Sequence, residues 1–216
     1  MDLFDDQPLA PEDARTAIAP GAVLLRGFAR ADEAALLQAL EAVLALAPPQ
    51  HLETPGGYAM SVLTTSCGRL GWVSDRDGYR YTAHSPHTGQ PWPDMPACFA
   101  AMAQDAAAQA GYPDFLPDAC LINTYGPGAK MSLHQDKDER DLRAPIVSVS
   151  LGLPAVFQFG GLQRKAPTQR LRLAHGDVLV WGGPTRLAFH GVLPLAEGQH
   201  PLLGRRRVNL TFRKAA

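Results

Sequence analysis

The chain is organised around the stretch Leu133-His134-Gln135-Asp136-Lys137-Asp138, which follows a turn rich in Gly and Pro at residues 125–128. His134 and Asp136 stand two positions apart, so in extended backbone an imidazole and a carboxylate leave the same face. We expect His190, far along the chain, to supply a third ligand, which predicts a metal site of His134, Asp136 and His190. Two His and one carboxylate on one face of a metal are typical of non-heme Fe(II) oxygenases.

A second His-x-Asp pair, His175 and Asp177, has the same spacing. It flanks Gly176 between two expected strands, where the turn itself favours Asp and Gly. We therefore interpret this pair as structural rather than metal-binding. The remaining histidines are interpreted in the same way, as ordinary surface or core groups: His51, His84, His87 and His200.

The stretch at residues 207–213 has the clearest alternation in the chain. Its polar face carries Arg207, Asn209, Thr211 and Arg213, and its other face is apolar. A half-exposed strand with its charges in water would give the same pattern. Two Arg with an Asn between them instead favour a dicarboxylate pocket, because a guanidinium binds carboxylate bidentately. Asn123 and Tyr125 share one face of another expected strand and offer hydrogen bonds to the same ligand.

Composition indicates a globular protein without an obvious charged partner. The 216 residues are 46% hydrophobic and 19% charged, enough to form a full core. The 20 basic and 21 acidic residues nearly cancel, so net charge predicts neither a nucleic-acid binder nor a membrane-surface protein. Three Cys without CxxC spacing fit a reducing cytoplasm. An acidic N-terminus and the lack of a long apolar run predict neither a targeting segment nor membrane insertion.

The first half of the chain predicts an arm, a short strand, two helices and an irregular segment. Residues 1–20 lack periodicity and are expected to form an arm, and residues 22–25 a buried strand. Apolar residues at helical spacing predict a helix from Asp32 to Pro48, and an Ala-rich stretch predicts another over 99–110. Between them, residues 51–96 contain Gly-Gly and Asp-Gly turns and aromatics, which fit a loop-rich surface and a substrate lid equally well.

The second half of the chain is β in character. Strands are expected over residues 120–125, 146–153, 156–159, 171–173, 178–181, 187–190 and 207–212. This pattern predicts an α+β protein whose core, residues 119–213, is a double-stranded β-helix (jelly-roll) or a related barrel with supporting N-terminal helices. Under the lid interpretation of residues 51–96, a β-hairpin substrate lid completes the fold. In the absence of a repeat or a linker, residues 1–216 are expected to form a single catalytic domain.

Together, Asn123-x-Tyr125, His134-x-Asp136, His190 and Arg207-x-Asn209-x-x-x-Arg213 resemble the AlkB family of Fe(II)/2-oxoglutarate dioxygenases, which repair alkylated nucleic acid. The resemblance runs from Thr54 to the C-terminus. It implies oxidative demethylation of N-alkylated bases, of the 1-methyladenine and 3-methylcytosine type, in single-stranded DNA, with RNA and double-stranded DNA as further candidates. Fe(II), 2-oxoglutarate and O2 would yield formaldehyde, succinate and CO2.

The resemblance also implies a role for each matching residue. The Fe(II) ligands and catalytic set would be His134, Asp136 and His190. The 2-oxoglutarate set would be Arg207 and Tyr125 at the distal carboxylate, with Asn123, Asn209 and Arg213 near the metal-bound end. Trp72 would stack on a flipped-out base whose other face meets His134, and Asp138 would face a base made cationic by methylation. The expected rim and lid residues are Tyr79, Arg164, Lys130, Lys137, Thr54, Met60 and Ser61.

Two other functions remain compatible with these residues. A 2-oxoglutarate dioxygenase acting on a protein or a small molecule would keep the iron and cosubstrate residues but would need neither Trp72 nor Asp138. A non-catalytic jelly-roll binding module would use the His and Arg residues to hold an anionic ligand. For the preferred function we expect a cytoplasmic monomer without a membrane partner.

Overall fold

The computed structural model describes residues 14–216, so residues 1–13 of the expected arm lie outside the described part. Its helices are α1 (Glu33–Leu46), α2 (Ala97–Gln109) and the 3-10 turns Phe28–Arg30 and Gly183–Thr185. Its strands are β1 (Arg15–Ala19), β2 (Ala22–Leu25), β3 (Gln50–Glu53), β4 (Ala59–Gly68), β5 (Gly71–Asp75), β6 (Gly78–Thr82), β7 (Ala119–Tyr125), β8 (Met131–His134), β9 (Ile146–Gly152), β10 (Ala155–Phe159), β11 (Gln169–Leu173), β12 (Val178–Trp181), β13 (His190–Val192) and β14 (Arg207–Arg213).

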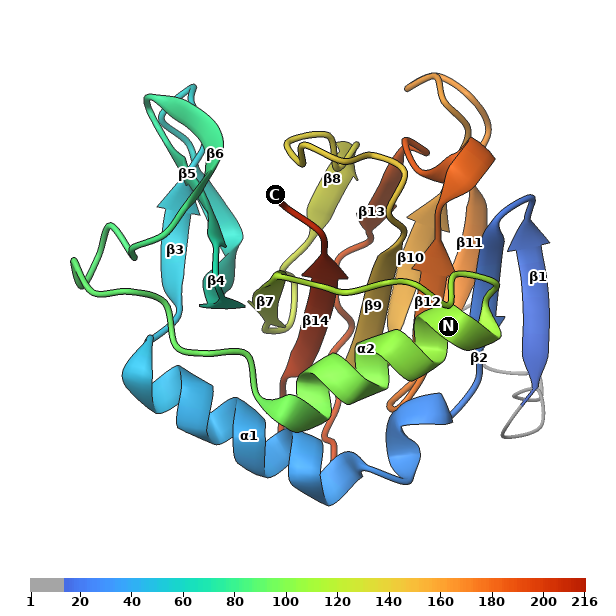
Figure 1. Cartoon of the computed structure of the whole chain (residues 1–216), viewed down its shortest axis with the longest axis horizontal. Helices are drawn as coiled ribbons and strands as arrows, with labels where there is room; N and C mark the ends of the chain where they lie inside the picture. Colours follow the sequence, from blue (N-terminus) through green and yellow to red (C-terminus); the bar gives the residue numbers. More distant parts are fainter. Residues whose placement is uncertain (1–13) are drawn as a thin grey trace.

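Two antiparallel sheets form the jelly-roll that the sequence predicts. The major sheet has eight strands in the order β1-β2-β12-β9-β14-β7-β4-β3, and the minor sheet has four in the order β11-β10-β13-β8. The hairpin of β5 and β6 is a separate two-stranded sheet that stands beside β3 and β4 (Figure 1). Within the expected lid, β3 and β4 therefore extend the major sheet, and β5–β6 is the free hairpin.

The two helices cover the outer face of the major sheet (Figure 1). In α1, Leu36, Leu40 and Val43 recur at helical spacing and are buried against that face. In α2, Phe99 packs edge-on against Phe212 of β14, with ring centroids 6.0 Å apart. Both expected helices are thus confirmed. No helix within residues 14–216 has the length and apolar character needed to cross a membrane.

Both faces of β14 are buried, which rules out the half-exposed alternative for this strand. Its apolar residues, among them Leu210 and Phe212, belong to the core beneath the helices. A second core lies between the two sheets and includes Phe157 and Trp181. The polar face of β14 points into this inner space, so its Arg and Asn side chains lie inside the protein rather than in water.

Two local expectations were wrong. Residues 15–19 of the expected arm form β1, which pairs antiparallel with β2 and is the edge strand of the major sheet. The expected strand over 187–190 begins only at His190, because Ala188 N–H bonds Thr185 O and Phe189 N–H bonds Gly161 O. His190 therefore stands at the start of β13 rather than at the end of a strand.

Candidate active site

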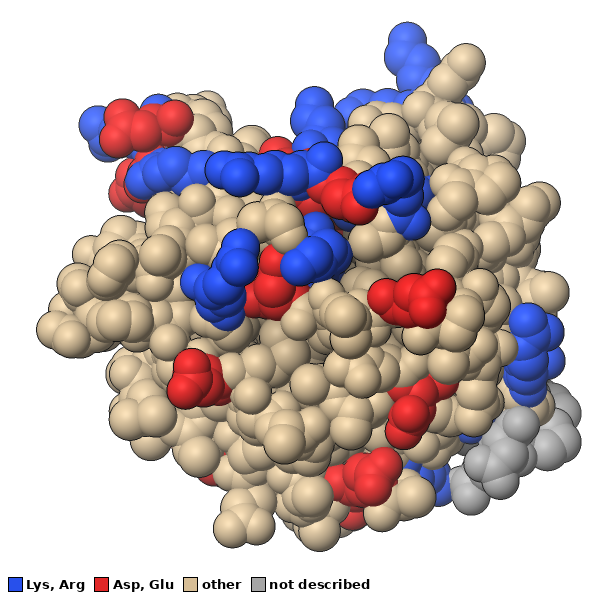
Figure 2. Space-filling view, viewed as in Figure 1, with Lys and Arg blue, Asp and Glu red and all other residues tan. Residues whose placement is uncertain are grey.

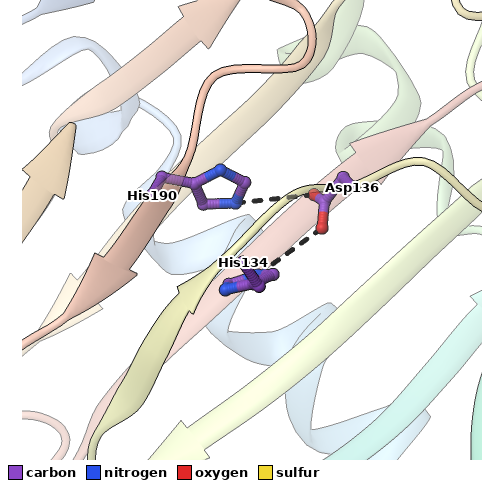
Figure 3. A group of neighbouring side chains, drawn as sticks. All are labelled: His134, Asp136 and His190. Carbon is purple, nitrogen blue, oxygen red and sulfur yellow. Dashed lines mark ion pairs between the residues drawn. The ribbon is translucent and has the colours of Figure 1, made fainter. Parts of the chain in front are cut away.

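The structure brings His134, Asp136 and His190 together at the mouth of the jelly-roll (Figure 3). His134 ends β8 and is the register partner of His190 at the start of β13, while Asp136 follows β8 by two residues. His134 Nε2 lies 3.5 Å from Asp136 Oδ1, and His190 Nε2 lies 3.8 Å from Asp136 Oδ2. The three candidate ligand atoms all lie within 4.8 Å of one another.

Main-chain carbonyls orient both imidazoles. His134 Nδ1 bonds Ser132 O at 2.8 Å, and His190 Nδ1 bonds Ala188 O at 3.0 Å. Each Nδ1 is therefore the donor, and each Nε2 is left as a lone-pair ligand turned toward Asp136. Burial lowers the pKa of His190 to about 4, so its imidazole is neutral near pH 7. Neutral imidazole is the form that binds metal.

Asp136 is held in its charged form. Burial alone would raise its pKa, but Arg213 and the two imidazoles hold that pKa well below the usual range of a carboxyl. Arg213 donates to Asp136 Oδ2 from Nη2 at 2.5 Å and from Nε at 3.0 Å. One buried carboxylate and two imidazoles are the donor set that suits Fe(II), so these residues fit that ion.

A buried cation with unsatisfied donors lies against Tyr125, which lines the site. Arg207 is 1% exposed, yet its Nε and Nη1 have no hydrogen-bond partner, and only Nη2 donates, to Ser150 Oγ at 2.9 Å. Its guanidinium lies 5.1 Å from the centroid of the Tyr125 ring. Buried guanidinium donors are normally satisfied, and a carboxylate is their best partner. The orphaned donors therefore fit the expected 2-oxoglutarate carboxylate.

Hydroxyl groups fix the two amides of the pocket. Asn209 Nδ2 donates to Ser148 Oγ and Val149 O, and Asn209 Oδ1 accepts from Thr211 Oγ1. Asn123 Oδ1 accepts from Thr64 Oγ1 at 2.9 Å. Both N–H donors of the Asn209 side chain are thus used within the protein. This favours a role in positioning the neighbouring side chains over a direct hydrogen bond to the cosubstrate. Asn123, Tyr125, Asn209 and Arg213 line the cavity next to the expected metal ligands, whereas Arg207 lies behind Tyr125.

A cleft of about 750 Å³ leads from the expected metal ligands to the hairpin β5–β6. It is lined by all the residues that were expected to contact substrate: Thr54, Met60, Ser61, Trp72, Tyr79, Lys130, Lys137, Asp138 and Arg164. Ser61 Oγ and the main chain of Lys130 exchange hydrogen bonds of 3.0 and 3.1 Å, which join β4 to the segment before β8. The structure thus gathers these residues on one surface.

Trp72 is held at the edge of this cleft by two neighbours. Its Nε1 donates to Asp138 Oδ2 at 2.8 Å. Its ring stacks on Tyr79 with centroids 5.5 Å apart and an interplanar angle of 13°. Arg164 and Phe189 also line the cleft, and the guanidinium of Arg164 lies 5.3 Å from the Phe189 ring centroid. An aromatic plane, a carboxylate and a cation therefore border the space in front of the expected metal ligands.

Several polar residues of the site were not anticipated from the sequence. Glu139, Arg186 and Tyr81 form a buried network beside Asp136. Ser148 and Ser150 alternate on β9 and face β14, a period-two signal that the sequence does contain. Arg186 lies between Thr185 and Leu187 and belongs to no periodic sequence pattern that would have indicated a site.

The competing pair His175 and Asp177 is structural, as the turn chemistry predicts. Asp177 accepts from Arg26 Nη1 at 2.6 Å and from the N–H groups of Gly27 and Ala174 at 2.9 Å each. His175 Nδ1 accepts from Gly152 N–H, and its Nε2 bonds Glu33. Both ring nitrogens are therefore used, and no metal is required to explain this pair.

Asp177→Asn is expected to lower the free energy of unfolding by about 1.5–3 kcal/mol, because charge-assisted hydrogen bonds of a buried group are lost. Thermal denaturation of the metal-free protein measures the change. Glu197→Gln is the matched control, since Glu197 and its partner Arg205 are exposed and their ion pair contributes little. Equal melting temperatures for the Asp177 variant and the parent would contradict this structural role.

Comparison with known proteins gives a consistent picture. The family model of the 2OG-Fe(II) oxygenase superfamily matches residues 21–213. The chain is 57% identical over 215 residues to the alpha-ketoglutarate-dependent dioxygenase AlkB of Escherichia coli, covering all of this chain and 98% of that protein. The human nucleic acid dioxygenase ALKBH1 is 31% identical over 135 residues, 61% of this chain and 34% of that protein. The solved structure of OsALKBH1 superposes with a TM-score of 0.80 at 29% identity, covering 93% of this chain and 100% of that one.

Proposed function

Because the chain belongs to the AlkB family of 2OG-Fe(II) oxygenases, we propose that it oxidatively removes N-linked methyl groups from bases of nucleic acid. Fe(II), 2-oxoglutarate and O2 are the cofactor and cosubstrates of the family. The proposed substrates are 1-methyladenine and 3-methylcytosine in single-stranded DNA, with RNA and double-stranded DNA as alternatives. The relative named as a nucleic acid dioxygenase supports this substrate class.

The observation that carries the proposal is the position of Trp72 beside Asp138. The Trp72 ring borders the cleft that opens on His134, and its Nε1 is bound to the Asp138 carboxylate. Enzymes that react with a base must take it out of the stack and hold it between flat or apolar side chains. A base between Trp72 and His134 would place its edge near Asp138. A carboxylate there favours a base that methylation has made cationic over a neutral one.

When bound, Fe(II) and 2-oxoglutarate supply the oxidising chemistry, in which O2 converts 2-oxoglutarate to succinate and CO2 and hydroxylates the N-methyl carbon. The chain supplies the geometry. His134, Asp136 and His190 would hold the metal, and Arg207 with Tyr125 would hold the cosubstrate carboxylate. The hydroxymethyl group then leaves as formaldehyde, and the unmodified base remains. The cleft walls keep the rest of the nucleotide away from the oxidising centre.

Basic residues around the cleft support a nucleic-acid strand as the ligand. Lys130, Lys137 and Arg164 line it, and groups of this kind bind the backbone of single strands together with stacking aromatics. On the face seen in Figure 2, most Lys and Arg side chains lie across the upper half of the molecule, with some Asp and Glu among them. We extend the proposal to a single catalytic domain that acts as a cytoplasmic monomer.

The proposal is tested by incubating the protein with Fe(II), 2-oxoglutarate, O2 and methylated single-stranded oligonucleotides. We expect formaldehyde and repaired base in equal amounts from 1-methyladenine and 3-methylcytosine, and neither product from an unmethylated strand of the same sequence. Succinate formation without repair of any lesion would instead favour the dioxygenase that acts on a protein or a small molecule. Parallel assays on methylated RNA and duplex DNA rank the alternative substrates.

Trp72→Ala is expected to weaken binding of a methylated oligonucleotide by about 1–3 kcal/mol, the usual contribution of one stacked base. Its effect on 2-oxoglutarate binding should be small, because the contacts of Trp72 face the cleft and Asp138 rather than Arg207. Anaerobic titrations of the metal-loaded protein measure both affinities. Trp72→Phe is the control that retains a ring without the Nε1 donor. Equal losses of both affinities would contradict the stacking role.

A further inference from the structure

The expected metal ligands lie on two segments that are far apart in the sequence. His134 and Asp136 lie at and just after the end of β8, whereas His190 begins β13. The two strands pair at His190 with His134 and at Val192 with Met131, with an irregularity between. This pairing does not extend to Asp136. The position of Asp136 relative to His190 must therefore be set by other contacts.

Arg186 provides such contacts from within the protein. Its side chain is 3% exposed and donates from Nη1 to Asp136 O at 2.7 Å, from Nε to Ala144 O at 2.9 Å and from Nη2 to Glu139 Oε2 at 2.9 Å. These acceptors lie at the start, middle and end of the loop that follows β8. Because a guanidinium is planar and rigid, one side chain fixes the whole loop against the segment that leads to His190.

A second bond joins the same two segments. Gln135 Nε2 donates to Leu187 O at 2.6 Å, so the residue between the two ligands His134 and Asp136 is tied to the chain next to Arg186. These side-chain contacts thus take the place of strand pairing beyond His134, where no pairing between β8 and β13 positions Asp136.

Glu139 extends the contacts of Arg186 to the opposite side of the site. Its Oε1 accepts from Tyr81 Oη at 2.6 Å and lies 3.4 Å from Arg213 Nε. Arg213 in turn donates to Asp136 Oδ2. Two buried cations and two buried anions therefore form one balanced network around Asp136, and removing one member would leave a buried charge without its partner.

The same network reaches the hairpin. Tyr81 of β6 is the register partner of Trp72 of β5. Trp72 donates to Asp138 while Tyr81 donates to Glu139. The hairpin thus docks on two consecutive carboxylates that follow the expected metal ligand, and one of them, Glu139, is the residue that Arg186 holds.

From these contacts we infer that Arg186 and Glu139 are positioning residues of the metal centre, which hold Asp136 in register with His190 and link the hairpin to it. This inference rests on the proposed metal site. Neither side chain supplies a ligand atom. Their effect is on the mutual position of the ligands, so it should be visible in metal affinity before any substrate is present.

Co(II) binding to the metal-free protein tests the inference, followed by absorption spectroscopy under anaerobic conditions. Arg186→Met is expected to raise the Co(II) dissociation constant about tenfold or more, the usual range for residues that orient metal ligands, and to change the Co(II) spectrum. The matched control is Arg26→Met, because Arg26 forms another largely buried ion pair, 2.6 Å from Asp177 and away from the cleft. It should lower stability and leave Co(II) affinity within about twofold of the parent.

The double variant Arg186→Met with Glu139→Met separates positioning from stability. Replacing a buried ion pair by apolar residues often restores stability, so the melting temperature should recover from that of Arg186→Met. Co(II) affinity should stay low, since the contacts to Asp136 O and Ala144 O are still missing. If Arg186→Met does not fold, Co(II) binding is measured on Arg186→Lys instead, which keeps the positive charge. It is expected to bind Co(II) more weakly than the parent.

Co(II) affinity that recovers together with stability in the double variant would overturn the inference, as would an equal loss in Arg26→Met. Parent-like affinity in all Arg186 variants would overturn it as well while leaving the proposed metal site intact. Failure of the parent protein itself to bind Co(II) would instead overturn the metal site on which the proposed function depends. The two failures are therefore distinguishable.

Discussion

Asp136→Ala is expected to abolish formation of succinate from 2-oxoglutarate. Asp136 is the one anion among the three expected ligands, and Arg213 with the two imidazoles keeps it ionised. Loss of residues that only orient a metal ligand costs about 10–100-fold in affinity or activity. Loss of the anionic ligand itself should exceed that range, so we expect turnover to fall by at least about 100-fold.

This change unbalances the buried network and should lower stability, but Arg213 keeps a second anionic neighbour, Glu139, 3.4 Å from its Nε, so we still expect a folded protein. Succinate is measured with saturating Fe(II) and 2-oxoglutarate, and Co(II) titration shows whether metal binding is lost in parallel. Asp141→Ala is the control, since that carboxylate lies nearby on the loop after β8 but bonds the exposed Arg143. Near-parent turnover by Asp136→Ala would refute the assignment of the metal site.

The parts of the site that the sequence predicts are those carried by short-range patterns. The spacing of His134 and Asp136 and the alternation of β14 are local, and both place their side chains in the same inner space. Turn chemistry likewise separates the structural pair at residues 175–177 from the expected metal-binding pair His134 and Asp136. His190 was the expected third ligand, and the likeness of the motifs to a family supported it, but no local pattern indicates its place at the start of β13.

What the sequence does not predict depends on contacts between distant single residues. Arg186 reaches Asp136 across 50 positions and Glu139 across 47, and neither charge belongs to a periodic pattern. Residues 15–19 become strand β1 only because β2 offers an open edge. In both cases tertiary pairing decides the structure, and local propensity carries little information about it.

Arg207→Met is expected to weaken 2-oxoglutarate binding by about 2 kcal/mol or more, which corresponds to roughly 30-fold. Arg207 is buried behind Tyr125, and its Nε and Nη1 lack partners in the protein. A dicarboxylate in the pocket would satisfy these two donors. Without the dicarboxylate, Arg207 is a buried cation with only part of its hydrogen-bonding capacity used. The cost of that cation predicts that the metal-free variant is no less stable than the parent.

Opposite effects on stability and on binding distinguish this prediction from general damage to the fold. Thermal denaturation measures the first, and anaerobic titration of the Co(II)-loaded protein with 2-oxoglutarate measures the second. Co(II) affinity should be unchanged without cosubstrate, because the hydrogen bonds of Arg207 reach Ser150 and not a metal ligand. Arg207→Lys should bind 2-oxoglutarate with intermediate affinity, since an ammonium keeps the charge but not the bidentate fork. A destabilised Arg207→Met that binds 2-oxoglutarate as the parent does would show that this guanidinium supports the fold and not the cosubstrate.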